Sequence, residues 1–270
     1  MTQSHRFAVL GVIVAAATAA VWLFGRTPLV AHADQGREAP QESRSADADP
    51  TSPSGAVLAP ATPGLTGERS RKAKARAAFE RGVAAYFESD LDAAIAAWDR
   101  ELELMPQRAP SHWQRGIALY QAGRPADAAR QFEQHQTLGT NDVENAAWHL
   151  LCVACSPGES IESARAKLLP IDLAADARVP MAEIYRLYAG RGDEAAVRKA
   201  AAAHGSEAAA MFADLYLGMW AEVGGDHDRA KELLAAAGTH ESVRQSYMAR
   251  SAAIHLKTWD RRHGEGAKTD

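Results

Sequence analysis

Residues 75–108, ARAAFERGVAAYFESDLDAAIAAWDRELELMPQR, are followed at once by residues 109–142, APSHWQRGIALYQAGRPADAARQFEQHQTLGTND, which repeat the same pattern. Six pairs of residues match at an offset of 34: Gly82 with Gly116, Ala94 with Ala128, Trp98 with Phe132, Phe79 with Trp113, Val83 with Ile117, and Tyr86 with Tyr120. A period of 34 with small and aromatic residues at fixed offsets is typical of a repeat made of two helices and a turn. The sequence therefore predicts an all-α superhelix, a solenoid of stacked helical hairpins.

Breaker and cap residues predict where the helices of these two repeats begin and end. We expect helices over residues 68–89 (beginning near Glu68 or Ser70), 91–104, 111–123 and 125–138. Gly82 would then lie inside a helix, where glycine costs ~1 kcal/mol relative to alanine. Close approach of the next helix would explain it, with Ala94 opposite and Trp98 filling the space toward the following repeat. In the second repeat, Gly116, Ala128 and Phe132 are expected to pack in the same way.

The matched residues resemble the tetratricopeptide repeat (TPR). At the eighth, twentieth, twenty-fourth and thirty-second positions of that repeat, the first copy has Gly82, Ala94, Trp98 and Pro106. At the same four positions, the second copy has Gly116, Ala128, Phe132 and Thr140, so that threonine replaces the proline. The resemblance implies a superhelix of about four to five hairpins with a C-terminal capping helix.

The remainder of the folded part, residues 68–260, follows the pattern less closely. A weaker third copy is expected over 141–169, and the two-proline segment 170–180 interrupts the array. Short helices are expected over 181–189 and 193–204. The pattern returns over 211–238, within helices 207–223 and 226–237, before a last helix over 241–259. Residues 261–270 are expected to form a flexible tail.

The N-terminal quarter predicts export rather than a folded domain. Phe7–Phe24 is a run of 18 residues without charge. It is long enough to serve as a membrane anchor, while Ala31-His32-Ala33 offers a signal-peptide cleavage site after Ala33. Cleavage and anchoring remain alternatives for residues 1–33. Residues 34–67, rich in Pro, Ala and Ser, predict a disordered linker.

The overall plan is similar to that of the NlpI-type bacterial envelope lipoproteins, including the Leu-Tyr-Leu-Gly of residues 215–218. In that family a dimeric scaffold brings proteases to peptidoglycan hydrolases. This chain lacks the lipidated N-terminal cysteine, since its cysteines stand at 152 and 155. The resemblance implies a non-catalytic scaffold, periplasmic or secreted, that binds other proteins or peptides. A purely structural homo-oligomer, such as a homodimer, is an alternative.

The charge balance argues against nucleic acid as a partner. The chain carries 30 basic and 34 acidic residues, a net charge of −4, and so lacks the basic footprint of nucleic-acid-binding domains. Five of the basic residues cluster at the start of the first predicted helix: Arg69, Arg71, Lys72, Lys74 and Arg76. They form either a solvated face or a contact with anionic lipid or another acidic polymer of the envelope.

Cys152-x-x-Cys155, with His149 one turn earlier, is the strongest pattern suggesting thiol or metal chemistry. At the end of a helix, rather than its start, the helix dipole does not lower a thiol pKa. A zinc site would also lack a fourth ligand. Buried apolar cysteines are the alternative that we favour, and we expect no cofactor and no enzymatic activity. Asp226, after Gly224-Gly225, is expected to be a helix cap rather than a metal ligand.

The candidate binding surface is the inner face of the first two repeats, where first helices of a repeat line the concave side. Its residues are Phe79, Val83, Tyr86, Phe87, Trp113, Ile117 and Tyr120. An aromatic stripe at helical spacing either belongs to the core or lines a groove for a peptide. The basic and amide residues with which some tetratricopeptide domains bind a C-terminal carboxylate are not at these positions.

Overall fold

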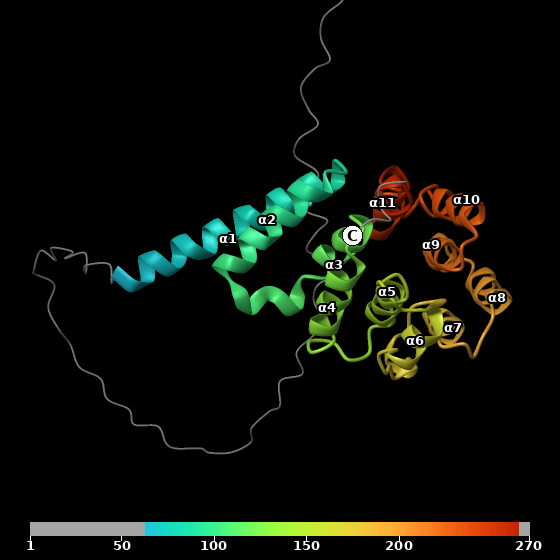
Figure 1. The fold of residues 1–270 in the computed structure, drawn as a ribbon. Helices are drawn as coiled ribbons and strands as arrows, with labels where there is room; N and C mark the ends of the chain where they lie inside the picture. The colour runs from blue at the N-terminus through green and yellow to red at the C-terminus, as the bar shows by residue number, and fades with distance from the viewer. Residues whose placement is uncertain (1–62, 265–270) are drawn as a thin grey trace, which may run out of the picture. The chain divides into compact units, whose positions relative to one another are not determined.

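The computed structural model describes residues 63–264, which consist of helices and loops without a strand (Figure 1). The apolar run Phe7–Phe24, the cleavage site after Ala33 and residues 34–62 of the expected linker lie outside the described residues. No helix in the described range is long and apolar enough to cross a membrane.

The helices follow one another with short connections. Their bounds are α1 (Pro63–Phe87), α2 (Leu91–Leu104), the 3-10 helix η2 (Pro106–Ser111), α3 (Trp113–Gln121), α4 (Pro125–His135), α5 (Val143–Ala154), α6 (Ile161–Ala166), η3 (Leu173–Ala175), α7 (Met181–Tyr188), α8 (Glu194–His204), α9 (Glu207–Val223), α10 (His227–Ala237), α11 (Tyr247–Lys257) and α12 (Asp260–His263). The all-α prediction is confirmed for this part of the chain.

Side-chain caps explain many of these boundaries. The side chain of Asp90 accepts a hydrogen bond from the Ala93 amide (3.0 Å), so that it satisfies a free N–H at the start of α2. Asp193, Ser206 and Asp226 cap α8, α9 and α10 in the same way. The expected cap role of Asp226 is therefore confirmed.

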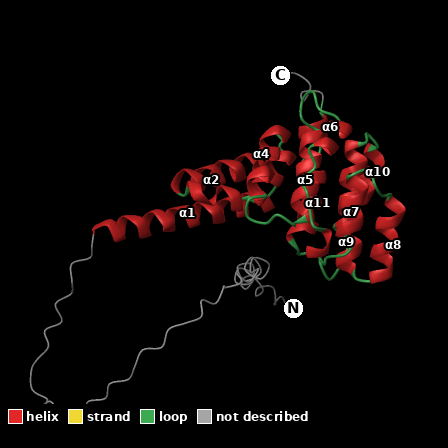
Figure 2. Cartoon of the chain, turned by 90° about the horizontal axis from the view of Figure 1, so that it is seen from below, coloured by secondary structure: helices red, strands yellow, loops and turns green. Residues whose placement is uncertain are grey.

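Neighbouring helices pack in pairs, α1 with α2, α3 with α4 and α9 with α10 (Figures 1 and 2). The first helices of different pairs also contact one another. Helix α5 packs against α3, α7 and α9, and α11 packs against α9. Their facing aromatic residues are buried, among them Tyr120, Trp148, Tyr188 and Tyr216. The core therefore lies between the first helices of the pairs.

Several boundaries differ from those predicted; for example, the helix expected over 125–138 ends at His135. α1 begins at Pro63 rather than near Glu68, because proline suits the first turn of a helix. The last long helix begins at Tyr247 rather than 241, after the cap Ser246. Residues 261–263 are not a frayed tail, because they form α12 and donate side-chain hydrogen bonds to the folded body.

Candidate functional site

The site is built on a recurrent contact between a glycine and a residue 16 positions later. A Cβ on Gly82 would lie 2.3 Å from Trp98 Nε1, and one on Gly116 would lie 2.8 Å from Phe132 Cζ. In the last regular pair, a Cβ on Gly218 would lie 2.9 Å from Leu234 Cγ. The bulky side chain of the second helix thus lies directly against the glycine of the first. The prediction that Ala94 faces Gly82 missed this closer contact.

Three of the seven predicted groove residues are part of the core. Tyr86, Ile117 and Tyr120 are each no more than 1 % exposed, so the groove assignment for them is wrong in this structure. A side chain without exposed surface has no area left for a partner. The remaining four, Phe79, Val83, Phe87 and Trp113, are half-buried and pack against the edge of the core. We call these four residues the α1–α3 strip.

Helix α11 contacts α1 and α3 through a small set of aromatic and polar side chains. Its first residue, Tyr247, stacks on Tyr86 with ring centroids 5.3 Å apart and planes at 2°. The same ring meets Trp113 edge-on at 4.7 Å, and the guanidinium of Arg250 lies 3.4 Å from the centre of the Phe87 ring. The chain's own helix α11 therefore contacts the surface predicted to be an open groove at Tyr86, Phe87 and Trp113.

A buried polar contact fixes α11 in this position. Tyr86 donates a hydrogen bond to Ser251 Oγ (2.8 Å), and Gln121 Nε2 donates to both the Oγ and the backbone carbonyl of Ser251 (3.2 and 3.1 Å). All three side chains are buried. Donors left without an acceptor in such a place are costly, so the contact specifies one register for α11.

A charged network secures the chain just after α11. Glu222 is buried on α9, where Arg262 Nε donates to its Oε1 (3.0 Å) and His255 Nε2 lies 2.6 Å from its Oε2. Burial disfavours the charge of Glu222, but His255, His263 and Arg262 outweigh it and hold the pKa of this carboxyl far below its usual range. Burial and the nearby Arg262 together lower the pKa of His255 to about 4, against the opposing effect of Glu222. The ionised carboxylate thus faces cationic and hydrogen-bonding partners in the interior.

The two thiols are poorly suited to chemistry. Burial raises the pKa of Cys152 well above its usual value and also raises that of Cys155. Cys155 taken as a whole residue is exposed to solvent. Its Sγ atom nevertheless lies 3.5 Å from the hydroxyl oxygen of Tyr120. His149 is buried beside Glu133 Oε1 (3.3 Å), and burial lowers its pKa. No cluster of three His, Cys, Asp or Glu with metal-binding geometry occurs among residues 63–264.

The irregular segment 170–180 is attached to the array through Arg178, which sequence reasoning missed. Arg178 forms ion pairs with Asp142, Glu144 and Asp176, and Glu144 also accepts a hydrogen bond from Tyr216 (2.7 Å). These ion pairs join the segment to the start of α5 and, through Tyr216, to α9. The only sequence signal was an arginine two residues after an aspartate, which is too common to assign a role.

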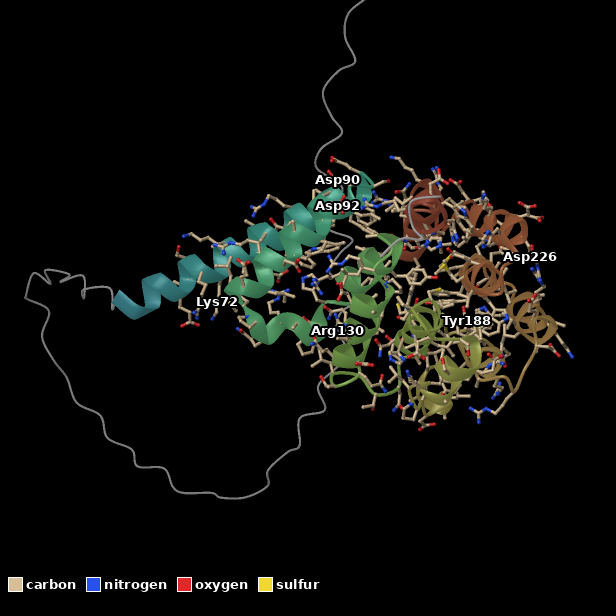
Figure 3. All side chains as sticks on the ribbon, in the orientation of Figure 1. Lys72, Asp90, Asp92, Arg130, Tyr188 and Asp226 are labelled. Carbon is tan, nitrogen blue, oxygen red and sulfur yellow. The ribbon has the colours of Figure 1, made fainter. Side chains whose placement is uncertain are left out.

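Figure 3 labels Tyr188, one of the buried aromatic side chains between the first helices of the pairs. Of the predicted surface, the α1–α3 strip is the part that retains accessible aromatic area. Comparison with known protein families and with curated proteins finds no match for this chain.

Proposed function

We propose that this chain is an exported, non-catalytic scaffold that binds another protein or a peptide through a tetratricopeptide-type solenoid. The observation that carries the proposal is the repeated packing of a helix glycine against a bulky residue 16 positions later. It occurs in the first, second and last regular pairs. Solenoids of this kind act by presenting surfaces built from several helices, and the thiols with raised pKa values give no support to a catalytic alternative.

The α1–α3 strip is the surface that we assign to the partner. Half-buried aromatic residues make good interface anchors, because they are already partly ordered and bury further apolar area on binding. Trp113 and Phe87 both contact Tyr247 of α11, so the strip lies along the line where α11 meets α1. Arg108 lies 5.7 Å from the Phe79 ring centre at the other end of the strip, where its charge is paired with Glu101 (2.8 Å). The aromatic residues of the strip suit a peptide that carries apolar side chains.

The location that we propose is extracytoplasmic, with residues 7–24 acting as a signal or as an anchor in the cytoplasmic membrane. It rests on the uncharged N-terminal run and on the cleavage-site residues Ala31 and Ala33.

Site-specific crosslinking in intact cells tests the proposed surface. A photoreactive phenylalanine analogue at Val83, in the strip, should give a discrete crosslinked adduct in the envelope fraction. The matched control is the same analogue at Leu138, which is 61 % exposed on the connection after α4. The adduct at Val83 should also disappear in the Phe79→Ala variant. Adducts of equal yield from both positions, or none from Val83 in a folded protein, would overturn the assignment of the strip.

A further inference from the structure

The N-terminal part of α1 extends beyond its partner helix. α1 has 25 residues, whereas α2 has 14, and α1 projects past the end of α2 in both views (Figures 1 and 2). Residues 67–74 are all exposed, and the first buried positions of α1 are Ala75 and Ala78. About two turns of helix therefore stand in solvent without tertiary packing.

This projecting helix is basic on all sides, unlike the rest of the chain. Residues 67–76 contain five basic residues and one acidic residue, a net charge of +4. Because the whole chain carries −4, the remaining residues carry −8. Lys72 points into solvent on this part of α1 (Figure 3).

The local electrostatics leave much of this positive charge uncompensated. Lys72 pairs with Glu68 (2.7 Å) and Arg76 with Glu80 (2.8 Å) on the exposed surface. Within the described part of the chain, no carboxylate lies within ion-pair distance of Arg69, Arg71 or Lys74. The first turn of α1 also holds no acidic residue.

We propose that the projecting part of α1, residues 67–76, binds the anionic headgroups of a lipid bilayer. Cations spread around a helix match an extended negative surface better than a single shaped ligand. The absence of an apolar stripe implies contact at the headgroup level without insertion of the helix. The inference rests on the proposed envelope location, and it gives the scaffold an orientation: the basic helix faces the membrane and the acidic body faces away.

Amine labelling of the full-length protein tests this contact. The protein is mixed with vesicles of phosphatidylcholine alone, or with about one third phosphatidylglycerol, and treated with a membrane-impermeant amine reagent. Mass spectrometry compares Lys72 and Lys74 with Lys199 and Lys231, which are exposed on α8 and α10. In anionic vesicles we expect labelling of the first two lysines to fall about threefold, with recovery in 0.5 M salt, because surface electrostatics are screened. The reference lysines should not change.

Matched variants separate charge from folding. Replacing Arg69, Arg71 and Arg76 by Gln keeps the reporter lysines and the helix propensity, and it should abolish the protection. Replacing the exposed Arg186, Arg198 and Arg244 by Gln removes the same charge from the body and should preserve it. Equal labelling in both kinds of vesicle, or protection that persists in 0.5 M salt, would overturn the proposal. If the lysines are not protected but the Val83 adduct still forms, the lipid contact is wrong and the proposed partner surface stands. If the lysines are protected but no Val83 adduct forms, the partner surface is wrong and the lipid contact stands.

Discussion

At the scale of single residues, Gly82, Gly116 and Gly218 show why the helices pair so closely. Each is inside a helix, where glycine is intrinsically unfavourable, and each has a bulky side chain against its Cα. Trp98 also donates a hydrogen bond from Nε1 to the Phe79 carbonyl (3.2 Å), which places its ring across α1. The missing Cβ therefore provides the space for the aromatic ring.

Gly116→Ala should lower the free energy of unfolding by about 1–3 kcal/mol, because the added Cβ meets a rigid ring in a filled core. Gly67→Ala is the matched control, since a Cβ there meets nothing within 4 Å and alanine stabilises an exposed helix by about 0.5–1 kcal/mol. Urea unfolding measures both. Adding Phe132→Leu to Gly116→Ala should restore part of the loss. Similar effects of the two glycine substitutions would contradict the packing argument.

At the scale of elements, α11 has the strongest influence on the candidate surface. It meets α1 and α3 through aromatic stacking and through the shared acceptor Ser251. Ser251→Ala should cost about 1–3 kcal/mol of unfolding free energy, because the buried donors of Tyr86 and Gln121 lose an acceptor. Chemical denaturation gives the value.

A double-mutant cycle identifies the hydrogen bond itself. Tyr86→Phe should cost clearly less in the Ser251→Ala background than in the native protein, since the bond is already lost there. Ala253→Ser, on the exposed side of α11, is the control that should change stability by no more than about 0.5 kcal/mol. Additive costs for Tyr86→Phe and Ser251→Ala would show that the two side chains do not interact.

At the scale of the whole molecule, the Glu222 network makes the attachment of α11 and α12 to α9 dependent on pH. The pKa of His255 is lowered to about 4 by burial, against an ordinary value near 6.5. Between these values the unfolded chain binds more protons than the folded one, so stability falls as the pH is lowered. The pKa of Glu222 is lowered in the folded state. The stability that this carboxylate contributes is therefore lost only when the pH falls below the pKa of a carboxyl in the unfolded chain.

The free energy of unfolding should therefore be roughly 2 kcal/mol lower at pH 5 than at pH 7. Urea titrations at the two pH values measure it. His255→Gln should reduce this difference, and the residual slope would come from His149, whose pKa is also lowered. An unaltered slope in His255→Gln would remove His255 as its source.

Local signals predicted the helices well, because caps and breakers act within a few residues. Pro125 and Asp226 begin their helices as expected, and the predicted helix over 207–223 coincides with α9. The position of α11 could not be predicted in this way. Its stacking on Tyr86 joins residues 161 positions apart, and the aromatic stripe of α1 is compatible with either a core or a groove. Arg178 is similar, because its partners are brought together only by folding.

The contact of α11 with the first pair has a consequence for how the chain can vary. In an open array, whole hairpins are gained or lost at little cost, because each unit touches only its neighbours. Here Arg261 also donates to Asp92 (2.8 and 3.0 Å), so the last helices are matched to the first ones. An inserted or deleted hairpin would move these partners apart, which fixes the number of units. For the same reason, unfolding should not begin by fraying from one end but should involve both ends together.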